Sequence, residues 1–537
     1  MQLHGGNVLG NAVAKSGAAT FRAVNPATGE TLEPAFHSAT DKEAARSLEL
    51  AEAAFSNYRN QSPEAIADFL DAIAAGLEGL GDELIARAKA ETALPEPRLL
   101  SERGRTTGQL RLFASLIREG SWVDARIDLP EPARKPVPKP DLRRMLVPLG
   151  PVVVFGASNF PLAFSVCGGD TASALAAGNP VVVKAHPAHP GTSELAARVV
   201  QEAARDRGMP EGVFSLVHGA APSLSVALVR HPATRAVGFT GSLQGGRALF
   251  DAAATRPVPI PVFAEMGSVN PVFVLPDAMK TRGAEIAQSL AKSVTIGVGQ
   301  FCTKPGLLIG LHDGNLTAFS QKLAATISST PCGTMLHSGI AERYRSGLAQ
   351  RLSDRGLELA TEQRSDLPAT QVASAVFVTE ARSFLQNSEL AQELFGPATL
   401  VVSCDSREDF ERIARSLEGQ LTVSIHATER DLEEHAALVD ILREKAGRLV
   451  FGGVPTGVEV SPAMHHGGPY PATTDPRFTS VGTAAILRFV RPVCYQDFPQ
   501  EFLPPELRDE NPRGIWRMID GKLTQEPVTS PSLMKTV

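Results

Sequence analysis

Short apolar runs alternate with helix-compatible stretches through most of this chain, and this alternation limits the fold more than any other feature. The runs of the first half are rich in β-branched residues and lie at 152–155, 181–183, 214–217, 236–239 and 261–263. The alternation resumes after residue 302, with runs at 307–309, 400–402 and 421–423. Strands that alternate with helices form βαβ units with parallel strands. The sequence therefore predicts an α/β protein with two parallel sheets in two domains.

Residues 40–120 have helical periodicity instead. Thr40 and Glu43 have the spacing of a capping box, and Ser62–Pro63 is typical of a helix start. A further helix is expected at residues 161–177, where the side chains are small. We therefore expect helices both before the first strand of this series and directly after it.

The proline-rich stretch 129–140 cannot be helical and makes a poor central strand, so we expect an extended arm there. The tail from residue 495 is also proline-rich and has no clear period. We expect the tail to wrap a surface rather than to form a core.

Composition excludes several classes of function. The net charge of −6 leaves no basic surplus to neutralise phosphates, which argues against a nucleic-acid partner. No apolar stretch reaches the length of a membrane span and the N-terminus does not resemble a signal peptide. The five cysteines are scattered and form no CxxC pair, which disfavours disulfides and zinc. We expect a cytoplasmic protein with no membrane contact.

Cys302 lies in the segment Gly-Gln-Phe-Cys-Thr, with glycines on both sides and Pro305 close behind. A lone cysteine is most often a small buried hydrophobe. These flanks cannot continue a regular helix, so we expect Cys302 on a turn near a helix end, where the thiolate is favoured.

Two polar residues complete a set of reactive groups. Glu265 ends an apolar run and Asn159 follows another; taken alone, they would be a solvated strand end and a turn asparagine. Together with a thiol they are the parts of a two-step acyl chemistry. A nucleophile traps a carbonyl, an amide stabilises the oxyanion, and a base activates water.

At these spacings the segments resemble those of the aldehyde dehydrogenase superfamily, from about residue 25 to about residue 494. Residues 299–303 are similar to the family motif Gly-Gln-x-Cys-Thr. Residues 265–271 resemble Glu-Leu-Gly-Gly-Lys-x-Pro but differ at Ser268 and Val269, which we expect only to alter loop packing.

This resemblance implies roles for the three reactive residues. Cys302 would be the nucleophile, and Glu265 would be the base that activates the deacylating water. The amide of Asn159 and the backbone N–H of Cys302 would form the oxyanion hole.

The resemblance also implies a domain plan and an assembly. Residues 1–125 and 146–266 would form a cofactor-binding domain, and residues 267–484 a catalytic domain. Residues 126–145 and 485–537 would form an extended oligomerisation element and tail of a homodimer or homotetramer.

Residues 239–246 follow a strand and open a helix, where backbone N–H groups can bind phosphate. They resemble the family's Phe-Thr-Gly-Ser-x-x-x-Gly, and Lys184 matches the family lysine that binds the adenosine ribose. Glu393 and Phe395 match a Glu-x-Phe-Gly-Pro motif, whose carboxylate holds the nicotinamide ribose. The implied cofactor-binding residues are Lys184, Thr240, Gly241, Ser242, Gly246, Glu393 and Phe395.

Pro187 bears on the choice of cofactor. It stands three positions after Lys184, where family members that prefer NAD commonly have glutamate. A carboxylate there would bind the ribose hydroxyls and repel a 2′-phosphate. Its absence leads us to expect NADP, with NAD also admitted.

Two histidine pairs could suggest a metal ion, but we expect none. His186 and His189 are separated by Pro187, which disfavours a helical face with both rings on it. The pair His465–His466 is expected in a loop over the substrate mouth rather than in a ligand set.

The substrate expectation depends on the C-terminal part of the chain. Residues 467–474 and 491–496, together with the loop 186–191, resemble a branch whose members oxidise 2,5-dioxovalerate (α-ketoglutarate semialdehyde) to 2-oxoglutarate with NADP. The same branch contains a long-chain fatty-aldehyde enzyme, and a fatty aldehyde is therefore the alternative substrate. The small residues Cys167, Gly168 and Gly169 are expected to widen the substrate tunnel.

A carboxylate-bearing substrate needs a cation at the mouth of the substrate tunnel. Arg103, Arg105 and Arg111, on one predicted helix, could supply it, or could form a solvated face or a subunit contact. Two other functions are weighed: a CoA-acylating enzyme, against which Glu265 argues, and a catalytically silent binding relative, against which all three reactive residues argue.

Overall fold

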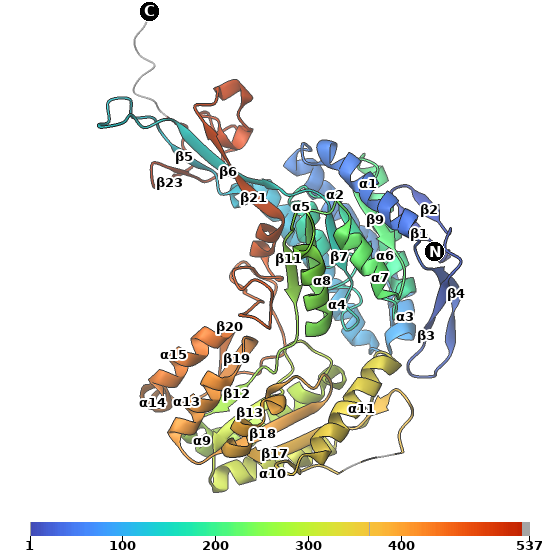
Figure 1. Cartoon of the computed structure of the whole chain (residues 1–537), viewed down its shortest axis with the longest axis vertical. Helices are drawn as coiled ribbons and strands as arrows, with labels where there is room; N and C mark the ends of the chain where they lie inside the picture. Colours follow the sequence, from blue (N-terminus) through green and yellow to red (C-terminus); the bar gives the residue numbers. More distant parts are fainter. Residues whose placement is uncertain (1, 363, 365, 529–537) are drawn as a thin grey trace, which may run out of the picture.

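The computed structural model describes residues 2–362, 364 and 366–528. The described residues form two large sheets covered by helices and a smaller sheet that projects to one side (Figure 1). No helix in this part of the chain is both long and apolar enough to cross a membrane.

The first large sheet has the strand order β11-β10-β7-β8-β9-β1-β2. Its strands are β1 (Asn7–Leu9), β2 (Ala12–Ala14), β7 (Val152–Phe155), β8 (Val181–Lys184), β9 (Phe214–Val217), β10 (Ala236–Thr240) and β11 (Val262–Glu265). Strands β7 to β11 are parallel, whereas β1 and β2 add an antiparallel edge. The valines of β7 and β8 are buried on both faces, as helix-covered parallel strands require. The carboxyl ends of the parallel strands meet at one edge of the sheet.

Helices pack around this sheet. They are α1 (Asp41–Tyr58), α2 (Pro63–Gly79), α3 (Gly81–Thr92), α4 (Glu96–Glu119), α5 (Gly169–Ala176), α6 (Pro190–Asp206), α7 (Pro222–Arg230) and α8 (Leu243–Ala254). The predicted capping box of Thr40 and Glu43 begins α1, and Ser62 and Pro63 begin α2. Both sequence-based helix starts are confirmed.

The helix expected at residues 161–177 is shorter than predicted, since only α5 is an α-helix there. Residues 161–168 form turns because their backbone donors have partners outside a helix. Leu162 and Ala163 both donate their N–H groups to the buried carboxylate of Glu102, at 2.9 and 3.0 Å. A Cβ at Gly168 would lie 2.5 Å from the carbonyl oxygen of Ala163, so this turn requires glycine.

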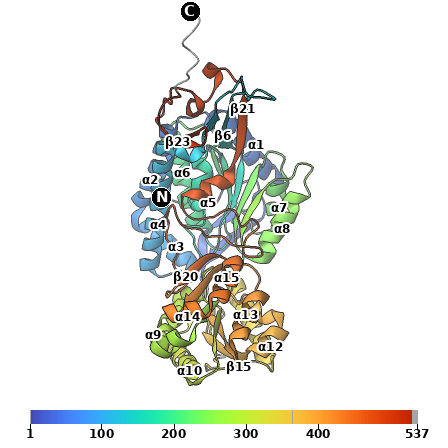
Figure 2. The same ribbon diagram turned by 90° about the vertical axis from the view of Figure 1, so that its left-hand side faces the viewer.

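The second large sheet has the order β15-β17-β18-β13-β12-β19-β20 and follows the first along the long axis of the molecule (Figure 2). Its strands are β12 (Val272–Val274), β13 (Leu307–Leu311), β15 (Glu358–Leu359), β17 (Ala375–Glu380), β18 (Ala398–Cys404), β19 (Gln420–His426) and β20 (Ala446–Phe451). All neighbouring strands pair in parallel except β15 with β17. The second predicted parallel sheet is therefore confirmed.

The helices of this second region are α9 (Pro276–Thr295), α10 (Gly314–Ser328), α11 (Ser338–Ser353), α12 (Ala381–Gln386), α13 (Arg407–Ser416), α14 (Glu429–Glu434) and α15 (Ala436–Lys445). Short strand pairs are formed by β3 (Thr20–Val24) with β4 (Thr31–His37) and by β14 (Gly333–Thr334) with β16 (Gln371–Val372).

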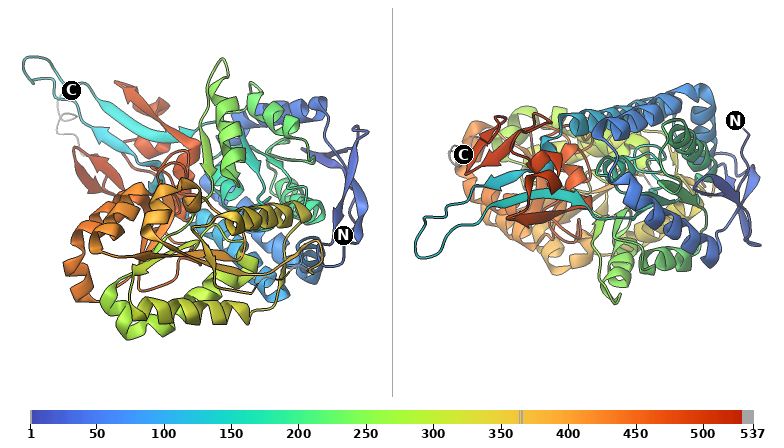
Figure 3. Two further views of the ribbon diagram at one scale, coloured as in Figure 1. Left: turned by 60° about the horizontal axis from the view of Figure 1, so that its bottom comes forward. Right: turned by 90° about the horizontal axis from the view of Figure 1, so that it is seen from above.

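The smaller sheet projects away from the main body (Figure 3). Its order is β21-β6-β5-β22-β23, from β5 (Arg126–Asp128), β6 (Leu142–Pro148), β21 (Val490–Gln496), β22 (Arg517–Ile519) and β23 (Lys522–Thr524). The proline-rich stretch 129–140 joins β5 to β6 and is largely exposed, as expected of an extended arm.

The expectation that the tail forms no core is wrong. Strand β22 pairs with β5, and tail residues share a small apolar cluster with the base of the arm. The buried members of that cluster are Val123, Ala125, Met145, Leu503, Leu507 and Ile515. The tail's apolar residues are spaced irregularly between prolines, so no local period reveals the cluster. The domain boundaries predicted above stay a prediction.

Candidate active site

The predicted site residues of the first region lie at the carboxyl edge of its sheet. Asn159 follows β7, Lys184 ends β8, and Thr240 and Glu265 end β10 and β11. Thr240 pairs with Glu265 in the parallel ladder, and the N–H of Gly241 donates to the carbonyl of Glu265 at 3.0 Å. The phosphate-binding turn predicted at Thr240–Gly241 therefore adjoins the predicted general base.

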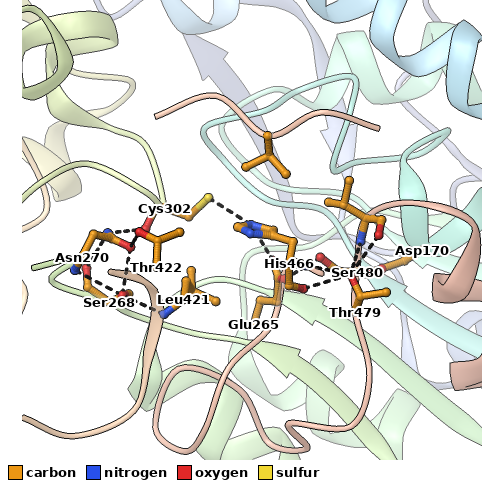
Figure 4. A network of polar contacts seen from close by, with 12 residues as sticks. Asp170, Glu265, Ser268, Asn270, Cys302, Leu421, Thr422, His466, Thr479 and Ser480 are labelled. Atoms are coloured by element: carbon orange, nitrogen blue, oxygen red, sulfur yellow. Dashed lines mark hydrogen bonds and ion pairs between the residues drawn. The ribbon is translucent and has the colours of Figure 1, made fainter. Parts of the chain in front are cut away.

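Cys302 lies on a turn that follows α9 and the short 3₁₀ helix η2 (Ile296–Gly299). Gly299 has a positive φ of 64°, and a Cβ there would lie 2.3 Å from the backbone of Gly396. The amide of Asn270 donates to the carbonyl of Cys302 at 2.8 Å, and Ser268 and Asn270 are joined by a hydrogen bond of 3.0 Å (Figure 4). The segment after Glu265 thus supports the turn that carries the thiol.

The expectation that this turn favours the thiolate is wrong. Burial raises the pKa of the Cys302 thiol to about 12, and the carboxylates of Glu265 and Glu393 add to the increase. Arg105 opposes the increase. The thiol is neutral before substrate binds and needs a proton acceptor.

Glu265 is buried, with 5% of its surface exposed. The hydroxyl of Ser480 donates to Oε1 of Glu265, and the backbone of Thr473 bridges to the same residue. Burial raises the pKa of Glu265 to about 8, and the hydrogen bond from Ser480 limits the increase. A cavity of about 20 Å³, lined by Glu265 and Ser480 among others, adjoins the carboxyl group and is large enough for one water molecule.

His466 connects the thiol to the carboxyl group. Its Nε2 lies 3.5 Å from Sγ of Cys302 and 3.6 Å from Oε2 of Glu265 (Figure 4). Burial lowers the pKa of His466 to about 3, so the ring is neutral at neutral pH. In the tautomer with an unprotonated Nε2, this atom can accept a hydrogen bond from the thiol. The prediction that His465–His466 lies over the substrate mouth is wrong for His466, which is inside the site.

Asn159 faces the turn of the nucleophile. Its Nδ2 donates to the carbonyl of Gln300 at 3.0 Å, two residues before Cys302. This contact places Asn159 against the segment that carries the thiol. Its role toward a substrate stays a prediction.

Arg98 of α4 holds the two sides of the predicted oxyanion hole together. Its guanidinium lies 4.7 Å from the ring of Phe160 and 4.4 Å from the ring of Phe301, the neighbours of Asn159 and Cys302. It also donates to the carbonyl of Asn159 at 3.0 Å. Cation–π contacts of this kind between desolvated groups are worth about 2 kcal/mol. Arg98 therefore stabilises the relative position of the amide and the thiol.

The predicted phosphate-binding turn has the geometry to bind an anion. Ser242 caps α8, and the N-terminus of that helix is exposed. Gly246 is required for close packing, because a Cβ there would lie 2.7 Å from the side chain of Met266. Lys184 is buried at the end of β8, and burial lowers its pKa to about 8. A helix N-terminus and a lysine at the same edge of the sheet suit a dinucleotide phosphate and its ribose.

Glu393 comes from the second region and reaches the same site. A Cβ at Gly267 would lie 2.6 Å from Oε2 of Glu393, so glycine is needed for this approach. Burial raises the pKa of Glu393 to about 7, and Lys304 opposes the increase. Phe395, two residues on, is half-buried against the core of the second region. The structure therefore brings both halves of the predicted cofactor site together.

The residues expected to widen the tunnel do not do so. Cys167 is 3% exposed within the main core of the first region, and its thiol contacts the carbonyl of Ala196. A Cβ at Gly169 would lie 2.6 Å from the amide of Gln109, so this glycine fits close packing rather than open space.

The histidines His186 and His189 stack with ring centroids 5.4 Å apart. Within the described residues, no group of three or more histidine, cysteine, aspartate or glutamate side chains is arranged to hold a metal ion.

Sequence reasoning missed His466, Arg98 and Ser480. Each meets its partners across a long separation in sequence, 164 residues for His466 and Cys302 and 215 for Ser480 and Glu265. The available signal for His466 was its position directly before Gly467 and Gly468, where the segment that resembles the 2,5-dioxovalerate branch begins. Nothing local distinguished the other two.

Comparison with known proteins supports the predicted family and fold. Residues 13–468 match the model of the Aldehyde dehydrogenase family. The chain is 50% identical to alpha-ketoglutaric semialdehyde dehydrogenase 2 of Azospirillum brasilense over 523 residues, which are 97% of this chain and 100% of that protein. It is 46% identical to alpha-ketoglutaric semialdehyde dehydrogenase of Acinetobacter baylyi, over 95% of this chain and 96% of that protein. A solved gamma-glutamyl-gamma-aminobutyraldehyde dehydrogenase from Burkholderia cenocepacia has the same fold, with a TM-score of 0.79 and 22% identity, covering 92% of this chain and 97% of that one.

Proposed function

Since the chain belongs to the aldehyde dehydrogenase family, we propose that it oxidises 2,5-dioxovalerate to 2-oxoglutarate through a covalent intermediate on Cys302. The observation that carries the chemistry is the contact of one histidine nitrogen with both the thiol and the buried carboxyl group. The observation that carries the substrate is the near-complete coverage of two semialdehyde dehydrogenases at 46–50% identity.

The first half of the reaction forms the thioester. Nε2 of His466 is the nearest acceptor for the thiol proton, and Arg105 favours the thiolate by its charge. The sulfur attacks the aldehyde carbon, while Asn159 and the N–H of Cys302 stabilise the oxyanion. When bound, the nicotinamide cofactor supplies the acceptor for the hydride of the aldehyde. Lys184, the N-terminus of α8 and Glu393 would hold that cofactor.

The second half hydrolyses the thioester. Glu265, in its ionised form, takes a proton from the water that adjoins it, and the hydroxide attacks the acyl carbon. The cavity beside Glu265 and Ser480 offers the space for that water. A base with a raised pKa binds the proton of water more readily than an ordinary carboxylate does.

The substrate proposal is tested by the purified wild-type protein. Its kcat/KM for 2,5-dioxovalerate is expected to exceed that for pentanal, an uncharged aldehyde of equal chain length, and that for a long-chain aldehyde. The formation of reduced nicotinamide is followed by absorbance. Preference for the long-chain aldehyde would replace the proposal with the fatty-aldehyde alternative, and absence of any oxidation would favour a silent binding relative. A product that requires coenzyme A would indicate the acylating reaction.

The family uses NAD or NADP, and NADP is the proposed preference. Pro187 lies in the turn between β8 and α6, three residues after Lys184. No carboxylate stands at that position to repel a 2′-phosphate.

Pro187→Glu is therefore expected to move the ratio of kcat/KM values for NADP and NAD toward NAD by at least about tenfold, equivalent to about 1.4 kcal/mol. The new carboxylate would accept hydrogen bonds from the ribose hydroxyls and repel the phosphate. The control is Pro190→Ala, which lies in the same segment at the start of α6. A wild-type kcat/KM about tenfold better with NAD would contradict the proposal.

We also propose that the assembly, the roles of the domains and the cellular location are those that the family resemblance implies. The projecting arm and the exposed apolar side chains Leu449 and Phe451 of β20 suit a homodimer or homotetramer. The domain plan given by the sequence is retained, and the free state of all five cysteines is compatible with the cytoplasm.

A further inference from the structure

Two arginines from different regions of the chain converge on one loop near the thiol. Arg105 of α4 donates from Nη1 to the carbonyl of Val458 at 2.7 Å. Arg448 of β20 donates from Nη1 to the carbonyl of Gly457 at 3.0 Å and from Nη2 to that of Pro455. The loop 455–458 therefore holds both guanidinium groups in place.

Neither guanidinium has a carboxylate partner. Among the described residues, Arg105 and Arg448 form no ion pair with an acidic side chain, and Nε of each is buried without a hydrogen-bond partner. Glu102 is paired with Arg98 at 3.7 Å, and Glu459 and Glu265 act on Arg105 through their charge alone. Both side chains are half-buried, and a partly desolvated cation without an ion-pair partner is costly. Both guanidinium groups therefore keep donor capacity for an anionic ligand.

The two charges lie at the reaction site. Both act electrostatically on Cys302 and on His466. Arg105 also packs over the ring of Phe164 at 5.7 Å. That ring belongs to an apolar cluster with Phe160 and Val458, and Phe160 contacts Phe301, the neighbour of the nucleophile. An apolar wall with two unpaired cations beside a nucleophile is a place for a short chain that ends in an anion.

We propose that Arg105 and Arg448 together bind the carboxylate and the adjacent 2-oxo group of the substrate, at the end remote from the aldehyde. This assignment rests on the proposed function and names the residues that select its anionic substrate. A carboxylate next to a carbonyl offers coplanar acceptor oxygens, which suit the planar donors of guanidinium groups. The carboxylate would be the anionic partner of the two guanidinium groups.

The other two arginines of the predicted set have partners elsewhere. Arg111 is exposed and forms two hydrogen bonds of 2.7 Å with the carboxylate of Glu78. Arg103 donates to the carbonyl of Gly81 at 2.8 Å. Arg111 is therefore a matched control, since it lies on the same helix as Arg105 and carries the same charge away from the site.

The kinetic test compares Arg105→Gln and Arg448→Gln with Arg111→Gln. Each of the first two is expected to lower kcat/KM for 2,5-dioxovalerate about 10- to 100-fold, mainly through KM, the range for a lost hydrogen bond to a charged group. Their kcat/KM for pentanal should fall at least about tenfold less, because weaker stabilisation of the thiolate by Arg105 would slow the reaction of both aldehydes equally. Arg111→Gln should leave both substrates unaffected. Equal losses on both aldehydes would overturn the proposal and assign the arginines to stabilisation of the thiolate. Unchanged kinetics on both would overturn it as well.

A binding measurement supplies a readout without turnover. Glutarate, a dianion without an aldehyde, is titrated into the wild-type protein and the three variants by calorimetry. Weaker binding is expected for Arg105→Gln and Arg448→Gln only. If either variant fails to fold, the thermal midpoint of the wild-type protein decides: glutarate should raise it and the uncharged glutaramide should not. Equal effects of the two compounds would contradict an anion site.

The outcomes separate this inference from the proposed function. A wild-type protein that prefers pentanal to 2,5-dioxovalerate refutes the proposed substrate, and the subsite with it. A wild-type protein that prefers 2,5-dioxovalerate, with variants that keep this preference, refutes the subsite alone.

Discussion

Cys302→Ala is expected to abolish aldehyde oxidation, with a loss in kcat on the order of 10⁴-fold or more, the scale on which covalent nucleophiles contribute. The loss follows from the geometry, since Sγ is the atom that His466 contacts. The measurement is steady-state formation of reduced nicotinamide with 2,5-dioxovalerate as substrate.

Cofactor binding should survive this change, because the proposed cofactor contacts come from Lys184, α8 and Glu393. Calorimetric titration with NADP checks this point. Cys494→Ala is the matched control, because Cys494 is a free and exposed cysteine on β21. Retention of a substantial part of the activity by Cys302→Ala would remove Cys302 from the reaction.

Glu265→Gln is expected to form the thioester and then stop. The amide keeps the shape of the side chain and its acceptor for Ser480 but cannot take a proton from water. Stopped-flow absorbance should show a burst of reduced cofactor close to one equivalent per active site, followed by turnover about 10²- to 10⁴-fold slower than in the wild type. Loss of the burst itself would show that Glu265 also serves as the final acceptor for the thiol proton, through His466.

The pH dependence of deacylation gives the same assignment an independent check. The pKa of Glu265 is raised to about 8, and the ionised form is the active one. The deacylation rate of the wild-type protein should therefore rise from about one pH unit below 8 to about one unit above it and then level off. The residual rate of Glu265→Gln should lack this step. A rate that falls across the same interval would indicate that the protonated form is active.

Short stretches of sequence were sufficient to predict the strands and helix starts that depend on neighbouring residues. Runs of valine such as those at β7 and β8 are buried on both faces of a sheet, and no other arrangement suits them. The caps of α1 and α2 were readable because the capping side chain and its partner lie three residues apart. The carboxyl ends of parallel strands meet at one edge of a sheet, so the sequence alone was sufficient to place Asn159, Lys184 and Glu265 at that edge.

Long-range contacts decided the rest. The turn at residues 161–168 exists because Glu102, some sixty residues earlier, accepts two of its N–H groups. The core of the tail exists because β22 pairs with β5. The position of His466 depends on the docking of residues 472–474 along β11, where the N–H of Met266 donates to the carbonyl of Ala472 at 2.8 Å. The pKa of Cys302 depends on burial and on the carboxylates of Glu265 and Glu393, neither of which its glycine-rich flanks reveal.

The most direct test of the central claim is the mass of the trapped intermediate. Glu265→Gln is mixed with NADP and 2,5-dioxovalerate, quenched in acid and digested, and the peptides are sequenced by mass spectrometry. Cys302 should carry the 2-oxoglutaryl group as a thioester, and Cys494 in the same digest should be unmodified. An unmodified Cys302 in a sample that has released its burst of reduced cofactor, or an acyl group on another residue, would contradict the account.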